Sequence, residues 1–256
     1  MLLTILGCSG SAPGPRSPSS GYLLEADGFL LCVDLGSGTL AELQGVRDPF
    51  AMDALLFSHL HPDHCSDFSS LTVLRRYHPA PSRDPYAHRL PVFAPKEAPS
   101  RFANAYAPDE AERLATDLSD VYDFHTWNTD IVHIGPFTVD SVQAKHPCES
   151  YSFRITHGGA SLVYTGDTGP SDELHTLAAG ADVILAEASW AHGGNWPADL
   201  HLSGREAGEV AQRAGARRLL ITHVPPWTDA QAMLDEARAV FDGESVLVRQ
   251  GAEYSI

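Results

Sequence analysis

The chain has few basic side chains. Its 256 residues contain 17 Lys and Arg against 33 Asp and Glu, which gives a formal net charge of −16. An acidic surface repels polyanions at long range, so the composition disfavours nucleic acid as a partner, although a local basic patch would still be compatible with it.

Cysteine and long apolar runs are scarce as well. The four cysteines form no CxxC pair, so we expect free thiols in a reducing, cytoplasmic compartment. No stretch approaches the roughly 20 apolar residues of a membrane span. The opening MLLTILGCSG lacks a basic segment, and its run of about six apolar residues is shorter than the roughly 7–15 of a signal peptide. We interpret Leu2–Leu6 as a first β-strand.

The chain does contain enough apolar residues, 43 %, to bury a large core. We therefore expect one domain over residues 1–256, with apolar strands alternating with stretches of helical spacing. Asp27-Gly28 predicts a type I′ hairpin turn. Residues 66–78 predict a helix with Ser66 as its N-cap.

Residues 79–128 are rich in proline and then in aromatic side chains, with a helix predicted over 109–118. We consider two interpretations of this segment. It is either a cap over an active site, with aromatic rings available to stack on a base, or ordinary structure packed on a sheet.

Six apolar runs end in, or are directly followed by, a side chain that can bind a metal ion. Strands that open into loops at one edge of a sheet bring such groups together, and ligands of α/β proteins bind at such edges. The six residues are Asp34, His59, His146, Asp167, Glu187 and His223.

The stretch FSHLHPDHCSDF holds four of the strongest candidates within six positions. Imidazole and carboxylate groups bind borderline metal ions such as Zn²⁺. His59 and His61 are two residues apart on an extended segment, so they project to the same side and can hold one ion. Asp63 and His64 follow a bend and can reach a second ion. The adjacent Cys65 is either a further donor or a small buried residue.

The turn His59-Leu60-His61-Pro62-Asp63-His64 resembles the signature of the metallo-β-lactamase fold superfamily. The runs AKHPCESYSFRI, VYTGDTG and LLITHVPP resemble its later motifs, so the similarity extends over nearly the whole chain. The resemblance implies an α/β fold, a four-layer αββα sandwich of two mixed β-sheets flanked by helices.

The resemblance also implies two divalent metal ions, most simply Zn²⁺ with Mn²⁺ as the alternative. Asp167 would bridge the ions and Asp34 would support the ligand loop. Such a pair activates a water molecule, and Asp63 is the candidate to orient that water. The implied ligands are His59, His61 and His146 for one ion, and Asp63, His64 and His223 for the other.

Two further residues resemble the ribonuclease Z-like phosphodiesterase branch. Glu187 in LAEASW and His201 in DLHLSG resemble its HEAT and HST motifs, in which the histidine protonates the leaving oxygen or contacts the phosphate and the glutamate orients it. The chain departs from both motifs, with Glu-Ala-Ser and His-Leu-Ser. The shifted hydroxyl of Ser203 is better explained as a helix N-cap.

The expected substrate follows from the absence of a tRNA-binding arm. Members that process tRNA carry a long arm between the third ligand histidine and the bridging aspartate, but here His146 and Asp167 are 21 positions apart with one hairpin between them. The leading interpretation is therefore a phosphodiesterase for small substrates, similar to the atypical class II cyclic-nucleotide phosphodiesterases, that converts 3′,5′-cAMP to the 5′-monophosphate.

Three alternatives remain open at this point. A ribonuclease Z-type tRNA 3′-processing endoribonuclease would need a basic groove or arm-like loops. A lactonase or thioesterase would need an apolar pocket, or a site that excludes the Glu187–His201 pair. A metal-binding module without activity would need a filled coordination sphere. A homodimer is compatible with the sequence but is not specified by it.

Overall fold

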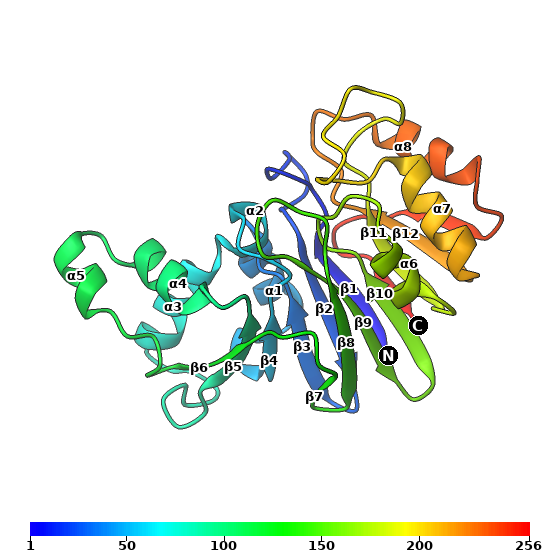
Figure 1. Cartoon of the computed structure of the whole chain (residues 1–256). Coiled ribbons are helices and arrows are strands. Elements are labelled where there is room, and N and C mark those ends of the chain that lie inside the picture. Colours follow the sequence, from blue (N-terminus) through cyan, green and yellow to red (C-terminus); the bar gives the residue numbers. More distant parts are fainter.

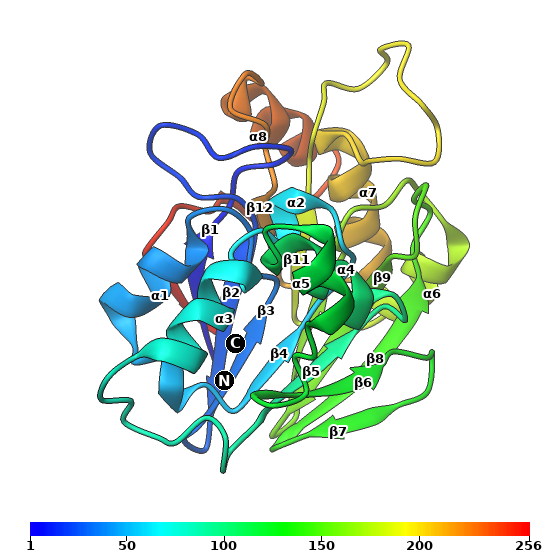
Figure 2. The same ribbon diagram turned by 90° about the vertical axis from the view of Figure 1, so that its left-hand side faces the viewer.

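The computed structural model describes residues 1–256. Two seven-stranded β-sheets pack face to face and helices cover their outer faces (Figure 1, Figure 2). The expected αββα sandwich is confirmed. The two chain ends meet, because β1 (Leu2–Gly7) pairs with β14 (Glu253–Ser255). None of the helices combines the length and apolarity that crossing a bilayer requires.

The first sheet has the order β14-β1-β2-β3-β4-β5-β6. Pairing is antiparallel from β14 to β3 and parallel from β3 to β6. The hairpin between β2 and β3 turns at Asp27 (φ 52°) and Gly28 (φ 78°), the left-handed pair that a type I′ turn requires. The remaining strands are β2 (Gly21–Ala26), β3 (Phe29–Val33), β4 (Ala54–Leu56), β5 (Leu90–Ala94) and β6 (Tyr122–Thr126).

The second sheet has the order β13-β12-β11-β10-β9-β8-β7 and repeats this plan. Its pairing is parallel from β13 to β10 and antiparallel from β10 to β7. Its strands are β7 (Val132–Ile134), β8 (Phe137–Gln143), β9 (Tyr151–His157), β10 (Ala160–Tyr164), β11 (Val183–Glu187), β12 (Arg218–Thr222) and β13 (Glu244–Leu247).

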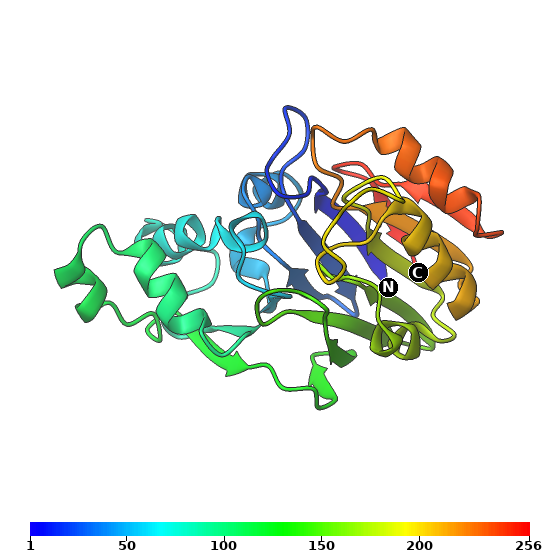
Figure 3. The same ribbon diagram turned by 45° about the horizontal axis from the view of Figure 1, so that its top comes forward.

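The helices fall into two sets, one for each outer face (Figure 3). The first sheet carries α1 (Thr39–Val46), a 3₁₀ helix (Pro49–Ala51), α2 (Pro62–Cys65), α3 (Phe68–Tyr77) and α4 (Ala98–Tyr106). The short helix α5 (Glu110–Ala115) buries no side chain and contacts α4. The second sheet carries α6 (Asp172–Ala178), α7 (Gly204–Ala214) and α8 (Ala230–Arg238). Each set packs its apolar stripe on the sheet beneath it and leaves its polar side to water.

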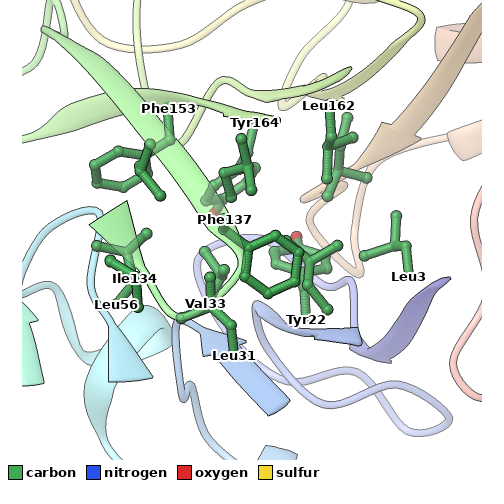
Figure 4. Packing of buried hydrophobic residues seen from close by; sticks show 14 of the residues in the cluster. Leu3, Tyr22, Leu31, Val33, Leu56, Ile134, Phe137, Phe153, Leu162 and Tyr164 are labelled. Carbon is green, nitrogen blue, oxygen red and sulfur yellow. The ribbon is translucent and has the colours of Figure 1, made fainter. Parts of the chain in front are cut away.

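The space between the sheets holds the central core. Alternate side chains of the facing strands interdigitate there, among them Leu3, Tyr22, Val33, Phe137 and Phe153, which are at most 2 % exposed (Figure 4). At about 25 cal/mol per Å² of apolar surface, this burial is the main term that holds the two sheets together.

Two sequence predictions fail locally. Ser66 does not cap α3: its backbone has helical angles at the end of α2, and Asp67 precedes α3 instead. The Pro62 turn forms a short helix of its own, which displaces the start of α3. The helix expected over 109–118 is shorter, since α5 ends at Ala115, and α4 before it was not anticipated.

The expected convergence of strand ends is confirmed. β3, β4, β8, β10, β11 and β12 finish at the same edge of the sandwich, at the top of Figure 1. The loops that follow these strands carry the candidate metal ligands.

Candidate metal centre

The structure gathers all nine candidate site residues at this edge. Together with Cys148, which was not a candidate, they fall into three neighbouring clusters in which the donor atoms lie within 4.8 Å of one another. The inner group is Asp63, His64, Asp167 and His223; the outer group is His59, His61, His146 and Cys148; the third cluster is Glu187, His201 and His223.

The inner group is compact and buried. His64 Nε2 and His223 Nε2 lie 3.2 Å apart. Asp167 Oδ1 is 3.1 Å from the first of these nitrogens and 3.2 Å from the second. Asp63 Oδ2 is 3.1 Å from His223 Nε2. All four side chains are at most 8 % exposed.

The outer group lies on the other side of Asp167. His61 Nδ1 is 3.0 Å from His59 Nε2 and 3.2 Å from His146 Nε2. The second carboxylate oxygen of Asp167, Oδ2, is 3.7 Å from His59 Nε2. Asp167 therefore presents one oxygen to each group, as a bridging ligand would.

Hydrogen bonds on the first-sheet side fix the tautomers of two imidazoles. His64 Nδ1 donates to Asp34 Oδ2 at 2.8 Å. Ser58 Oγ also donates to Asp34 at 2.8 Å, which leaves Ser58 Oγ to accept from His59 Nδ1 at 3.1 Å. Since both Nδ1 atoms carry hydrogen, the Nε2 lone pairs of His59 and His64 face the centre.

The second-sheet side repeats this arrangement. Ser189 Oγ donates to Glu187 Oε2 at 2.7 Å and accepts from His223 Nδ1 at 3.2 Å. His146 Nδ1 donates to the carbonyl oxygen of Leu200 at 3.0 Å. The Nε2 lone pairs of His223 and His146 thus also face the centre. Metal-binding histidines are typically oriented in this way.

The charges of the centre favour a cation. Burial by itself would lower the pKa of His223, but Asp167 and the neighbouring carboxylates outweigh it and raise that pKa to about 10. Burial also opposes protonation of His64, and Asp167 nevertheless raises the pKa of that residue. His59 differs, because burial and the surrounding imidazoles lower its pKa and keep it neutral. The carboxylates of the inner group therefore stabilise positive charge, carried by protons or by a metal ion.

One buried atom tests the fit of a metal ion directly. Asp167 Oδ1 is buried and makes no hydrogen bond. A buried carboxylate oxygen without a partner is costly, and a cation removes that cost. Lone pairs of nitrogen and oxygen converge on both sides of this carboxylate, and this donor set suits divalent metal ions.

The backbone is strained where it supports the centre. Only four residues other than glycine have positive φ, and three of them lie here: Ser11 (62°), Asp34 (58°) and His223 (53°). The backbone N–H of Ser11 donates to Asp63 Oδ2 at 2.8 Å, so this strain positions a donor to a candidate ligand. Strained residues of this kind concentrate at functional sites.

Glu187 and His201 form the third cluster, next to the inner group. His201 Nδ1 is 2.9 Å from Glu187 Oε2, and Thr168 N–H donates to Glu187 Oε1 at 2.7 Å. Burial disfavours the charged imidazole of His201, but Glu187 outweighs burial and raises its pKa. Glu187 thus orients the imidazole, whose Nδ1 also lies 3.8 Å from Asp167 Oδ2.

Sequence reasoning missed several supporting residues. Ser58, Ser189 and Tyr164 carry no motif of their own, yet Tyr164 Oη donates to Asp34 at 2.8 Å and both serines link a carboxylate to a histidine. Ser58 is adjacent to a candidate ligand in the sequence and Tyr164 lies three residues before another, and these positions are only a weak signal. Ser203 caps α7 in a capping box with Glu206, as predicted.

The cysteine near the centre is not the one that the sequence singled out. Cys65 is buried in the core beneath α3, which favours the interpretation as a small buried residue. Cys148 is exposed instead, with its sulfur 3.9 Å from His61 Nε2. All four cysteines are free thiols, as expected.

Comparison with known proteins identifies the family. Residues 35–224 match the model of the β-lactamase superfamily domain, which covers most of the chain. The chain therefore belongs to the β-lactamase superfamily. Its two mixed sheets flanked by helices are those of the metallo-β-lactamase fold, and it is a metal-dependent hydrolase.

Three relatives give the range of similarity. The uncharacterized protein Rv1339 of Mycobacterium tuberculosis is 48 % identical over 244 residues, 94 % of this chain and 87 % of the relative. A ribonuclease Z of Mycolicibacterium gilvum is 31 % identical over 247 residues, 88 % and 84 % of the two chains. The crystal structure of YhfI from Bacillus subtilis, a metallo-β-lactamase fold protein, has a TM-score of 0.85 at 28 % identity and covers 99 % and 98 %.

Proposed function

We propose that the protein is a phosphodiesterase with two divalent metal ions that hydrolyses small phosphodiesters, with 3′,5′-cAMP converted to the 5′-monophosphate as the leading substrate. The observation that carries the proposal is the contact between Glu187 and His201, 2.9 Å long, beside the metal-binding groups. Hydrolysis of an alkyl phosphodiester expels a poor leaving group, which requires a positioned acid.

The proposed ligands are His59, His61 and His146 for the outer ion and Asp63, His64 and His223 for the inner one, with Asp167 between them. Zn²⁺ is the proposed metal and Mn²⁺ the alternative, since imidazole and carboxylate donors admit both. Bound ions would supply Lewis-acid chemistry and lower the pKa of water. Metal analysis of the purified protein by plasma mass spectrometry checks the identity and the expected two ions per chain.

The chain's own groups provide the remaining steps. We assign the orientation of the attacking water to Asp63 Oδ2, which accepts a hydrogen bond from the backbone N–H of Ser11. We assign to His201 the transfer of a proton to the departing ribose oxygen, with Glu187 in contact with Nδ1 to hold the ring and stabilise its charge.

A small substrate is favoured over tRNA. The segment between His146 and Asp167 consists of the β9–β10 hairpin, which pairs within the second sheet and leaves no chain for an arm. The net charge of −16 also opposes a polyanion. We propose a monomer or homodimer in solution; sedimentation equilibrium distinguishes the two.

The second candidate is a ribonuclease Z-type endoribonuclease, favoured by the 31 % identity to the ribonuclease Z relative. A lactonase or thioesterase is less well supported, because the Glu187–His201 pair, which such a site is expected to exclude, lies beside the metal-binding groups.

Turnover of a substrate panel tests these alternatives. The metal-loaded protein is incubated with 3′,5′-cAMP, 3′,5′-cGMP, a 2′,3′-cyclic nucleotide, a precursor tRNA and a homoserine lactone, and kcat/KM values are compared. The proposal expects a 3′,5′-cyclic nucleotide to be the best substrate. Cleavage of the precursor tRNA far ahead of the small diesters would replace it with the second candidate.

The His201→Ala variant tests the acid itself. With cAMP, whose leaving group is an alkoxide, kcat should fall by roughly 10²–10⁴, the usual contribution of a general acid. With bis-p-nitrophenyl phosphate the loss should be much smaller, because p-nitrophenolate leaves without protonation. His192→Ala is the matched control, since His192 lies in the same loop but bonds to Ser203 instead of Glu187. Equal losses with both substrates would remove His201 from the acid role.

A further inference from the structure

A second feature adjoins His201. A pocket of about 440 Å³ opens there, a size that suits a small ligand. Its walls come from the loop after β11, the loop after β12 and the loop after β1. Its lining includes Trp190, Trp196, His201 and Trp227.

The aromatic content of this pocket is unusual for the chain. Three of its four tryptophans line the pocket, whereas the fourth, Trp127, is buried in the central core. Trp196 is 51 % exposed and Trp227 is 71 % exposed. Indole rings contribute little to the fold when they stand in water, so their concentration at one exposed place points to a ligand.

The rings are held in a defined arrangement. Trp190 and Trp196 stack with their centroids 5.2 Å apart and their planes 11° apart. The indole N–H of Trp196 donates to the carbonyl oxygen of Ala191 at 3.0 Å, so this ring is fixed within its loop. A side chain at Gly194 would collide with Trp196, so glycine makes room for it.

Trp190 connects this stack to the proposed acid. Its ring meets the ring of His201 edge to face at 5.0 Å. Whatever group stacks in the pocket is therefore adjacent to the imidazole that faces the leaving oxygen.

The chemistry of the leaving group indicates what that group is. In a 3′,5′-cyclic nucleotide the oxygen that departs is O3′ of the ribose, and the same ribose carries the base. If His201 protonates O3′, the base lies on the His201 side of the metal centre. Bases stack on tryptophan rings with little dependence on their identity.

The pocket beside the outer group is unsuited to a base. Its volume is about 370 Å³, and it is lined by His61, Glu97, Arg101 and Glu149 among others, with no Phe, Tyr or Trp. Only the His201 side offers an aromatic face.

We propose that the pocket of Trp190, Trp196 and Trp227 binds the nucleobase of the substrate and thereby makes the enzyme selective for nucleotides over other phosphodiesters. This inference rests on the proposed phosphodiesterase function and names the part of the substrate that the site recognises.

Activity with and without a base tests the inference. The kcat/KM of Zn²⁺-loaded protein is measured for 3′,5′-cAMP and for 1-O-methylribose 3′,5′-cyclic phosphate, which has no base. In Trp227→Ala and Trp196→Ala the ratio of the two values should fall roughly 5- to 150-fold, the range of one base–aromatic stack, mainly through a higher KM for cAMP. Trp227→Phe should retain most of the ratio because it keeps an aromatic face.

Tyr77→Ala is the matched control, since Tyr77 is 66 % exposed on α3 and does not line the pocket. It should leave the ratio unchanged. A ratio that is unchanged in both tryptophan variants, or a Trp227→Phe variant as poor as Trp227→Ala, would overturn the inference.

Binding separates this inference from the proposed function. Adenosine 5′-monophosphate and ribose 5-phosphate are titrated into wild-type and Trp227→Ala protein by calorimetry. We expect the wild type to bind the nucleotide more tightly, and the variant to lose that advantage. If the wild type prefers the nucleotide but hydrolyses no cyclic nucleotide, the phosphodiesterase function is refuted and the base pocket is retained. If the wild type binds the two ligands with equal affinity, the base pocket is refuted.

Discussion

The inner and outer groups of the metal centre have the same number of side chains but differ in their contact with water. All four residues of the inner group are buried. In the outer group His59 alone is buried, His61 and His146 are half-buried, and Cys148 is exposed next to the pocket of about 370 Å³. The two groups also differ in their carboxylates. The inner group contains two, whereas the outer group has none of its own and faces only one oxygen of Asp167.

This difference suggests that the two groups bind a metal ion with different affinities. Charged donors in a dry environment bind a cation strongly, whereas imidazoles at a water-filled rim bind it less strongly and leave room for exchange. We therefore expect the inner ion to be retained and the outer ion to be the more easily removed. Four substitutions test this expectation, beginning with the residue that the two groups share.

Asp167→Ala should have the largest effect. It removes an oxygen from each group at once and takes away the carboxylate that lies 3.1 Å from His64 Nε2 and 3.2 Å from His223 Nε2. Turnover should fall by more than the roughly 100-fold that loss of a supporting residue costs at other metal sites. Metal content, measured after desalting, should drop for both ions. A variant that keeps one ion at full occupancy would show that Asp167 serves a single group.

Asp34→Asn and Ser58→Ala should have intermediate effects and should separate the groups. Asp34 holds His64 directly and His59 through Ser58, so its substitution should weaken both ions, by roughly 10- to 100-fold in affinity. Ser58→Ala breaks the link to His59 and should weaken chiefly the outer ion. Competition with a chromophoric chelator measures the two affinities, and equal weakening of both ions by Ser58→Ala would contradict the assignment.

The clustering of the candidate ligands was predictable from the sequence because their placement is local. His59, His61, Asp63 and His64 share one turn, and the other candidates follow apolar runs that become strands ending at one edge of the sandwich. Such positions depend chiefly on strand direction, so the sequence pattern and the family resemblance together selected residues that lie close together in the structure.

The supporting contacts were not predictable, since they depend on how separate loops pack. Ser189 links Glu187 to His223 only because the loops after β11 and β12 meet, and Leu200 accepts from His146 through a carbonyl that has no side-chain signature. The aromatic pocket was missed for the same reason. The sequence drew attention to aromatics of residues 100–128, whereas Phe102 and Tyr122 are buried in the core and the exposed rings near His201 belong to the loops after β11 and β12.

The proposed cap at residues 79–128 stays a prediction, but part of it can be placed. β5 and β6 belong to the first sheet, so these stretches are structural. Glu97 and Arg101, at the start of α4 and within it, line the pocket beside His61. In a cap, the residues from Glu97 to Arg101 would be the ones to contact a substrate bound at the outer ion.

Cys148→Ser should have the smallest effect and completes the comparison. The sulfur of Cys148 lies against Nε2 of His61, whereas Nδ1 of His61 is the atom close to His59 and His146. The geometry therefore makes Cys148 a neighbour of a ligand, and one weak sulfur contact contributes about 1 kcal/mol at most, a change within about fivefold in kcat/KM. Metal analysis should still find two ions per chain. Loss of the outer ion alone would instead show that the Cys148 thiolate is a ligand. The outer group would then contain a negatively charged donor of its own.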